Sequence, residues 1–370
     1  MAESNLHKLS ARGQSVWIDY LSRDLLESGG LAQMMRDDAV VGVTTNPTIF
    51  QKAISQGESY DEQLKELLEE ETDPKEIFLQ LSARDVEAAL DLLSPVHEKT
   101  GYDGFVSWEV DPTLAYHRES TFDEAMRLHT WLDRPNLYVK IPATQPGLGA
   151  IEDCVANGKS INVTLIFSLQ RYAEVVEAYL RGLERLVAAG GDPKSVYSVA
   201  SFFVSRVDTE ADKRLEAIGS KQALDLRGTL AVANARLAYE HFEQTFAGQR
   251  WEFLAGKGAN PQRCLWASTS TKNPDYRDVL YVEELIGPQT VNTMPEETIH
   301  AFQDHGRVRG DTVQEAVDEA HALLTRFAEV GVDYDDVTKT LELEGVQKFA
   351  DSFKELLDGV RSKQGALARA

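Results

Sequence analysis

One lysine stands out because an apolar, strand-like segment leads directly into it. Lys140 follows the apolar residues 137–139 and precedes an isoleucine and a proline. Burial disfavours the ammonium form of a lysine, and a neutral amine can attack a ketone to form a Schiff base, an electron sink for carbon–carbon cleavage. Isolated lysines in such segments also often extend their charged end to solvent. The apolar setting favours the hypothesis of a Schiff-base lysine at position 140.

Schiff-base chemistry also needs groups that move protons, and two carboxylates stand at comparable positions. Asp19 and Glu109 each follow a short apolar segment. One would take a hydroxyl proton as the carbon–carbon bond breaks, and the other, through a water shared with Thr164, would carry protons while the carbinolamine forms and dehydrates. Asn46 and Asn162 could hold sugar hydroxyls. Asn46 precedes a proline and therefore also suits a helix start, and the two roles are compatible.

Two cations follow the later strand candidates and could bind a phosphate. Arg206 lies just past a segment containing Ser201, and Lys272 lies just past Ser268. Loops after the last strands of an α/β barrel commonly hold phosphate, and a guanidinium binds it through paired hydrogen bonds. An isolated arginine there would more often be a surface residue, so the residues alone leave both interpretations open.

The motifs of metal, nucleotide and serine-hydrolase chemistry are not found. None of the eight histidines follows a strand candidate, and the sequence contains no HExxH pair, glycine-rich dinucleotide motif, Walker loop or GxSxG element. Cys154 and Cys264 are too few for a disulfide framework and are interpreted as small buried side chains. We therefore expect a mechanism that uses no metal and no cofactor.

Short β-rich segments alternate with helical patterns along the chain, which favours parallel strands joined by crossover helices. Eight such units predict one closed (β/α)8 TIM barrel, an α/β fold in which polar residues at the strand ends, including Asn292 after the eighth strand, meet at one mouth. The eight strand candidates are Val16–Ile18, Val40–Val43, Gly104–Trp108, Leu137–Val139, Ile161–Val163, Val196–Ala200, Arg263–Ala267 and Gln289–Val291. The helical patterns include Tyr60–Glu71, Pro74–Leu93, Phe122–Leu132, Leu169–Ala188, Thr209–Ile218, Ala223–Phe246, Val313–Phe327 and Val337–Leu357.

The 370 residues would make two domains at about 150 residues each, but a barrel with insertions also accommodates them. No linker or low-complexity tract interrupts the chain. We predict a single domain over residues 1–370, with helical insertions around 53–103 and 207–262 and a helical tail over 311–370 that adds an extra C-terminal helix. The segment Gly256–Gly258 is predicted to be a flexible loop.

The net charge of −22, from 38 basic and 60 acidic residues, bears on the partners. An acidic chain repels nucleic acid and anionic membrane surfaces, so we expect neither as a partner. An anionic substrate would need a local cluster of cations such as Arg206 and Lys272. The first residues lack the apolar core of a signal peptide, and no segment approaches 18 apolar residues. We therefore expect a cytoplasmic location.

Five segments together resemble the conserved motifs of one enzyme family, the transaldolases. Residues 41–50 (VGVTTNPTIF) resemble the family signature near the second strand, and residues 136–144 (NLYVKIPAT) resemble its active-site lysine segment. Three more segments support the match in the family's order: 107–111 (SWEVD), 161–168 (INVTLIFS) and 200–206 (ASFFVSR).

The resemblance implies a transferase of the pentose phosphate pathway, active in carbohydrate metabolism. Its substrates would be phosphorylated sugars, with a dihydroxyacetone unit passing from sedoheptulose 7-phosphate to glyceraldehyde 3-phosphate to give erythrose 4-phosphate and fructose 6-phosphate. By motif position, Lys140 resembles the Schiff-base lysine, Asp19 the acid/base for cleavage, and Glu109 with Thr164 the pair that positions a water. The matching substrate-site positions are Thr44, Asn46, Asn162, Ser201, Phe203 and, for phosphate, Arg206.

The sequence departs from the family pattern after the seventh strand. Many transaldolases have a second phosphate-binding arginine there, whereas residues 267–272 are ASTSTK, so Ser268 and Lys272 are the candidates for that role. Two alternatives to a transaldolase are an aldolase of the same family that cleaves fructose 6-phosphate, and a non-catalytic barrel that only binds sugar phosphates. The oligomeric state stays open between a monomer and a homodimer.

Overall fold

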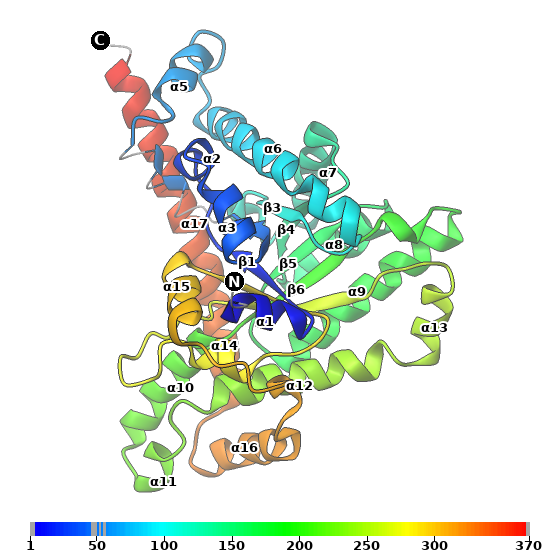
Figure 1. The fold of residues 1–370 in the computed structure, drawn as a ribbon, viewed down its shortest axis with the longest axis vertical. Helices are drawn as coiled ribbons and strands as arrows, with labels where there is room; N and C mark the ends of the chain where they lie inside the picture. The colour runs from blue at the N-terminus through cyan, green and yellow to red at the C-terminus, as the bar shows by residue number, and fades with distance from the viewer. Residues whose placement is uncertain (1–3, 46–49, 52, 55–56, 368–370) are drawn as a thin grey trace.

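Eight parallel strands close into a barrel in the computed structural model, which describes residues 4–45, 50–51, 53–54 and 57–367 (Figure 1). Each strand pairs with its sequence neighbours, and β1 closes the ring against β8 with Gln14 opposite Thr290. The predicted (β/α)8 fold is therefore confirmed. The strands are β1 (Gln14–Ile18), β2 (Val40–Thr44), β3 (Phe105–Glu109), β4 (Leu137–Pro142), β5 (Ile161–Ile166), β6 (Ser198–Phe203), β7 (Gln262–Ala267) and β8 (Thr290–Met294).

Helices surround the barrel and fill the long connections between strands (Figure 1). The α-helices are α1 (Asn5–Ala11), α2 (Arg23–Glu27), α3 (Gly30–Asp37), α5 (Asp61–Leu67), α6 (Pro74–Thr100), α7 (Arg118–Leu132), α8 (Gln145–Ala156), α9 (Leu169–Ala188), α10 (Ser205–Ile218), α11 (Lys221–Leu224), α12 (Leu230–Thr245), α13 (Gln249–Ala255), α14 (Leu280–Glu284), α15 (Glu296–His305), α16 (Val317–Glu329) and α17 (Tyr334–Leu367). Short 3-10 turns are η1 (Pro112–Leu114), η2 (Pro193–Ser195) and η3 (Thr312–Gln314). None of the described helices is long and apolar enough to cross a membrane.

Helix α9 shows how local sequence sets these elements. Its N-cap, Ser168, accepts a hydrogen bond from the backbone N–H of Arg171 at 3.0 Å, which satisfies one of the free donors of the first turn. Apolar residues then recur at helical spacing and are buried, among them Tyr172, Val175 and Val176. This strong pattern explains why the predicted range agrees with the observed one.

Two predicted helices are each divided in the structure. The pattern over Ala223–Phe246 is split into α11 and α12, and Gly228 lies between them with a φ of +69°. A Cβ at that glycine would lie 2.7 Å from the Tyr276 ring, so both the dihedral angle and the close contact require glycine. The pattern over Val313–Phe327 likewise becomes η3 and α16, with Ala316 at a φ of +52° between them.

The barrel interior below the mouth is filled by aromatic side chains. Trp17 is fully buried, and its ring occupies the space that a side chain at Gly42 would need. The rings of Tyr138 and Phe105 stack at 4.2 Å. At the amino end of the strands, the Arg263 guanidinium pairs with the Asp103 carboxylate at 3.0 Å. The interior is therefore a packed core with its polar cavity at the other end, as is typical of this fold.

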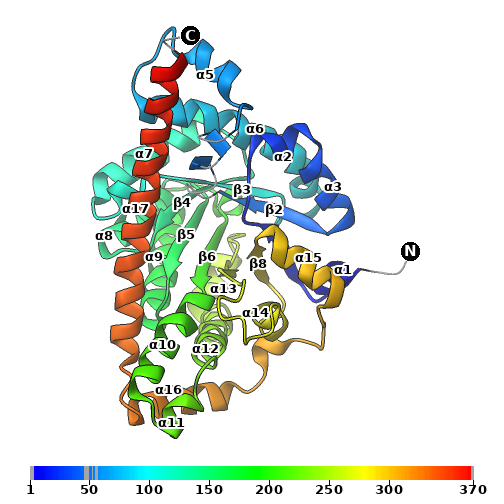
Figure 2. The same cartoon turned by 90° about the vertical axis from the view of Figure 1, so that its left-hand side faces the viewer.

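The long helix α17 runs along one side of the molecule and crosses the mouth of the barrel (Figure 2). At its start, the Tyr334 hydroxyl donates to the Asn234 side chain at 2.6 Å and accepts from the backbone N–H of Leu169 at 3.0 Å. Near its end, the Lys363 ammonium donates to the Asp61 carboxylate. These contacts hold α17 against the barrel at both ends.

Replacing Gly42 with alanine is expected to destabilise the fold by about 2 kcal/mol or more, because the added Cβ would lie 2.4 Å from the Trp17 ring in a packed core. Thermal unfolding followed by circular dichroism measures the change. Gly248→Ala is the matched control, since its Cβ would meet no atom closer than 3.6 Å. Equal melting temperatures for the two variants would contradict this account of the interior.

Candidate active site

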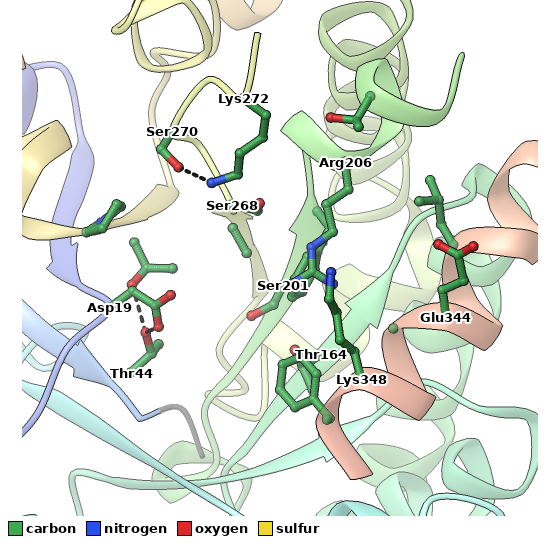
Figure 3. A pocket seen from close by; sticks show the side chains of 18 of the residues that line it. Asp19, Thr44, Thr164, Ser201, Arg206, Ser268, Ser270, Lys272, Glu344 and Lys348 are labelled. Atoms are coloured by element: carbon green, nitrogen blue, oxygen red, sulfur yellow. Dashed lines mark hydrogen bonds between the residues drawn. The ribbon is translucent and has the colours of Figure 1, made fainter. Parts of the chain in front are cut away.

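A cavity of about 450 Å³ opens at the carboxyl ends of the strands (Figure 3). Strands, the loops that follow them and helix α17 all contribute to its lining. Most of the predicted site residues line it: Asp19, Thr44, Lys140, Thr164, Ser201, Phe203, Arg206, Ser268 and Lys272. The structure thus brings together residues that are up to 253 positions apart in the sequence, from Asp19 to Lys272.

Lys140 lies inside β4 and is only 5% exposed. Its Nζ donates a hydrogen bond to the backbone carbonyl of Thr45 at 3.2 Å and lies 3.5 Å from Oε2 of Glu109. The ring of Phe349, from α17, lies 5.5 Å from the same nitrogen. An amine held by few polar partners in an apolar setting is suited to nucleophilic attack on a carbonyl.

Asp19 follows β1 and lines the same cavity as Lys140. One of its carboxylate oxygens accepts a hydrogen bond from the Thr44 hydroxyl at 2.8 Å, and Thr44 also contacts the Thr293 hydroxyl at 2.8 Å. Burial raises the pKa of Asp19, although the Lys140 charge and the Thr44 hydrogen bond oppose that rise. A carboxylate with a raised pKa is a stronger base than an exposed one, so Asp19 is suited to exchange protons with a hydroxyl.

Glu109 is opposite Lys140 in the pairing of β3 with β4. Burial raises its pKa to about 7, against the opposing effect of the Lys140 charge. Within the described residues, neither oxygen of Glu109 makes a well-formed hydrogen bond, and the buried Thr164 hydroxyl also has no partner. Glu109 is 3.5 Å from the Lys140 amine, and Thr164 lines the same cavity as Lys140. A carboxylate with a hydroxyl can together hold and polarise a water.

Four sequence predictions differ from the cavity lining. Glu109 lies beside Lys140 but lines a separate small cavity with Thr45 and Phe353. Asn162 is completely buried beneath it, where its amide donates to the Ser107 hydroxyl at 2.9 Å and accepts from the Ser201 hydroxyl at 2.7 Å. Asn46 lies outside the described residues. The expectation that Asn292 reaches the mouth is wrong, because β8 continues to Met294 and alternation turns Thr293 to the cavity instead.

Arg206 and Lys272 form the cationic side of the cavity (Figure 3). Arg206 is the second residue of α10, and its guanidinium lies 5.2 Å from the Phe203 ring. Lys272 donates to the Ser270 hydroxyl at 2.6 Å. Burial lowers the pKa of Lys272, and the neighbouring Arg206 charge lowers it further. Two like charges this close, beside the hydroxyls of Ser201 and Ser268, suit a phosphate group.

Helix α17 supplies a part of the cavity that is not among the predicted site residues. Its lining residues are Leu341, Glu344, Gly345, Lys348 and Phe349. Their spacing places them on one face of a helix, and that spacing is visible in the sequence. The pattern does not show which surface the helix covers, so the contribution of α17 could not be predicted.

A parallel barrel with a buried lysine and two carboxylates at its mouth defines the class of lysine-dependent (β/α)8 barrel enzymes. The family model described as Transaldolase/Fructose-6-phosphate aldolase matches residues 16–360 of the chain. The chain belongs to this family.

Similar proteins extend over nearly the full chain. The Transaldolase of Parafrankia sp. (strain EAN1pec) is 53% identical over 364 residues, which cover 98% of this chain and 99% of the relative. The Transaldolase of Acidothermus cellulolyticus is 55% identical over 356 residues, covering 96% and 95%. The Transaldolase of Mycobacterium tuberculosis (strain CDC 1551 / Oshkosh) is 53% identical, covering 97% and 96%. The resemblance found in the sequence is confirmed: the chain is a transferase of the transaldolase type, and Schiff-base chemistry is general to its family.

The pKa of Glu109 predicts how activity depends on pH. Because that pKa is raised to about 7, the carboxyl is protonated below this pH and becomes a base above it. We expect kcat/KM for fructose 6-phosphate to rise with pH through about 7. Glu109→Gln should lower the rate by about a hundredfold and remove this part of the profile. The substrate phosphate titrates near pH 6 with either enzyme, so a rise near pH 7 that persists in the glutamine variant would contradict the assignment.

Proposed function

We propose that the enzyme transfers a dihydroxyacetone unit from sedoheptulose 7-phosphate to glyceraldehyde 3-phosphate through a Schiff base on Lys140, giving erythrose 4-phosphate and fructose 6-phosphate. The observation that carries these residue assignments is the position of the Lys140 amine. It is 3.5 Å from Glu109, in a cavity that also holds Asp19 and, at its cationic side, Arg206 and Lys272.

The first half-reaction loads the lysine. The Nζ of Lys140 attacks the C2 carbonyl of the ketose, and the resulting carbinolamine loses water to give a protonated imine. Glu109 supplies and removes the protons of these steps through a water that it holds with Thr164. The unpartnered oxygens of both side chains beside Lys140 support this role.

The second half-reaction breaks and remakes a carbon–carbon bond. Asp19 takes the proton of the C4 hydroxyl, the C3–C4 bond breaks, and its electron pair moves into the imine to form a three-carbon enamine on Lys140. The aldose phosphate leaves, and the acceptor aldehyde takes its place. The enamine carbon then attacks that aldehyde, and Asp19 returns the proton to the new alkoxide, after which hydrolysis of the imine frees the product.

The remaining predicted residues would bind the substrate. Thr44, Ser201 and Phe203 line the cavity, where the sugar chain would lie. Asn162 would act on the substrate through Ser201, whose hydroxyl it positions, and Asn46 is assigned from its motif alone. Arg206 would bind the phosphate with Ser268 and Lys272.

We extend the proposal to the organisation of the chain. Residues 1–370 would form one domain, and the enzyme would act in the cytoplasm, where phosphorylated sugars are metabolised. It would be a monomer or a homodimer. Nucleic acid is not expected as a partner of so acidic a chain, with its net charge of −22.

Borohydride trapping tests the covalent step. Incubation with fructose 6-phosphate and borohydride should leave a three-carbon adduct on the peptide that contains Lys140, located by mass spectrometry. Erythrose 4-phosphate added before the reductant should deplete the adduct, because the acceptor takes the three-carbon unit. Lys140→Arg should form no adduct, since arginine stays protonated and cannot attack.

Each alternative predicts a different result from the same experiment. An aldolase would lose the adduct to water at a similar rate with or without the acceptor. A non-catalytic barrel would bind fructose 6-phosphate with no lysine modified. Normal transfer activity in Lys140→Arg would overturn the proposal altogether.

The role of Asp19 has its own test. In Asp19→Asn the amine can still form the imine, but no base takes the C4 proton. Borohydride should therefore trap a six-carbon adduct on Lys140, whereas the parent enzyme gives the three-carbon one. A three-carbon adduct formed at the parent rate would show that another group performs the cleavage.

A further inference from the structure

Helix α17 brings one further cation to the mouth of the barrel. The helix passes so close to β5 that a Cβ at Gly345 would lie 3.2 Å from the Leu165 side chain. Phe349 is 7% exposed and covers the Lys140 amine. Lys348, next to Phe349 in the sequence, also lines the cavity and extends toward the guanidinium of Arg206 (Figure 3).

Lys348 has no counter-charge in direct contact. Among the residues that the structure describes, no carboxylate pairs with Lys348, Arg206 or Lys272, although the molecule contains many surface ion pairs. The Lys348 charge is close enough to contribute to the lowered pKa of Lys272. Glu344 and Glu297 also line the cavity, and Glu297 attracts Lys272 without forming an ion pair with it.

Three cations that converge without direct partners repel one another. Arg206 is half-buried whereas Lys272 and Lys348 are exposed, so solvent moderates this repulsion but does not abolish its free-energy cost. A dianion placed between the cations would turn that repulsion into attraction. The nearby hydroxyls of Ser268 and Ser201 add hydrogen-bond donors without adding charge.

We propose that Lys348 binds the substrate phosphate together with Arg206 and Lys272, so that the C-terminal helix supplies part of the phosphate site. This inference rests on the proposed function and extends it. The loop after β7 has the sequence ASTSTK, without an arginine. Two lysines, one from that loop and one from α17, would then provide the charge that a second arginine provides in many transaldolases.

The position of Lys348 predicts that the enzyme prefers phosphorylated sugars over unphosphorylated ones. Lys348 lies at the rim of the cavity and is largely exposed, whereas the next residue packs over the Schiff-base lysine. Removal of the Lys348 charge should therefore weaken the binding of phosphorylated sugars and leave imine formation with an unphosphorylated ketone intact.

Lys348→Met tests this directly, because methionine keeps the length of the side chain and suits a helix. We expect KM for fructose 6-phosphate and the competitive inhibition constant of inorganic phosphate to rise about tenfold to a hundredfold, the range for one hydrogen bond to a charged group. Borohydride trapping of dihydroxyacetone on Lys140 should proceed at the parent rate. Lys348→Arg should restore most of the phosphate affinity.

Lys354→Met is the matched control, since Lys354 is exposed on the same helix and does not line the cavity. The inference is overturned if inorganic phosphate inhibits Lys348→Met and Lys354→Met with the same inhibition constant. It is also overturned if Lys348→Met slows dihydroxyacetone trapping as much as it raises KM, since the effect would then be on the fold. Failure of the proposed function is distinguishable, because the parent enzyme itself would then form no adduct on Lys140.

Discussion

The burial of one amine in an apolar barrel is the constraint on which the site depends. A lone buried ammonium costs several kcal/mol, so a charged group in this position must be paired or lose its proton. Lys140 has one backbone carbonyl at 3.2 Å and one carboxylate at 3.5 Å. These partners are enough to keep the lysine within the fold and too few to fix it as a permanent ion pair. The raised pKa of Glu109 shows the same constraint from the side of the carboxylate, because burial favours the neutral form of that group.

The closed barrel makes this balance possible because parallel pairing aligns residues from different strands in one layer. The pairing places Glu109 opposite Lys140, and Lys140 opposite Asn162. Below that layer, Trp17 fills the space left by Gly42 and closes the barrel interior. A displacement of one residue in any of these pairings would turn the polar side chain out of the barrel.

The sequence predicted the strands well because each has a short apolar segment bounded by turn residues. The carboxyl ends of the strands agree less well with the prediction. The predicted strand stops before Lys140, whereas β4 continues through Lys140 to Pro142. Local patterns also missed the break at Gly228, which depends on the distant Tyr276 ring. The contribution of α17 to the cavity could not be predicted for the same reason, because it depends on contacts between residues far apart in the sequence. An amphipathic pattern predicts a helix and its apolar face, but the surface that receives that face is fixed only by tertiary packing.

The distribution of charge in the molecule explains how a protein with an acidic exterior can bind anionic substrates. A net charge of −22 repels a sugar phosphate at long range, but solvent ions screen that field within about 10 Å. At the mouth the cations lie together, with Arg206 half-buried and Lys272 and Lys348 exposed, so a phosphate bound among them lies well within the screening length. The exterior can therefore be acidic without preventing the binding of an anion, provided that the cations of the mouth have no carboxylate partners of their own. This condition explains why unpaired cations at the mouth matter more for function than the sign of the net charge.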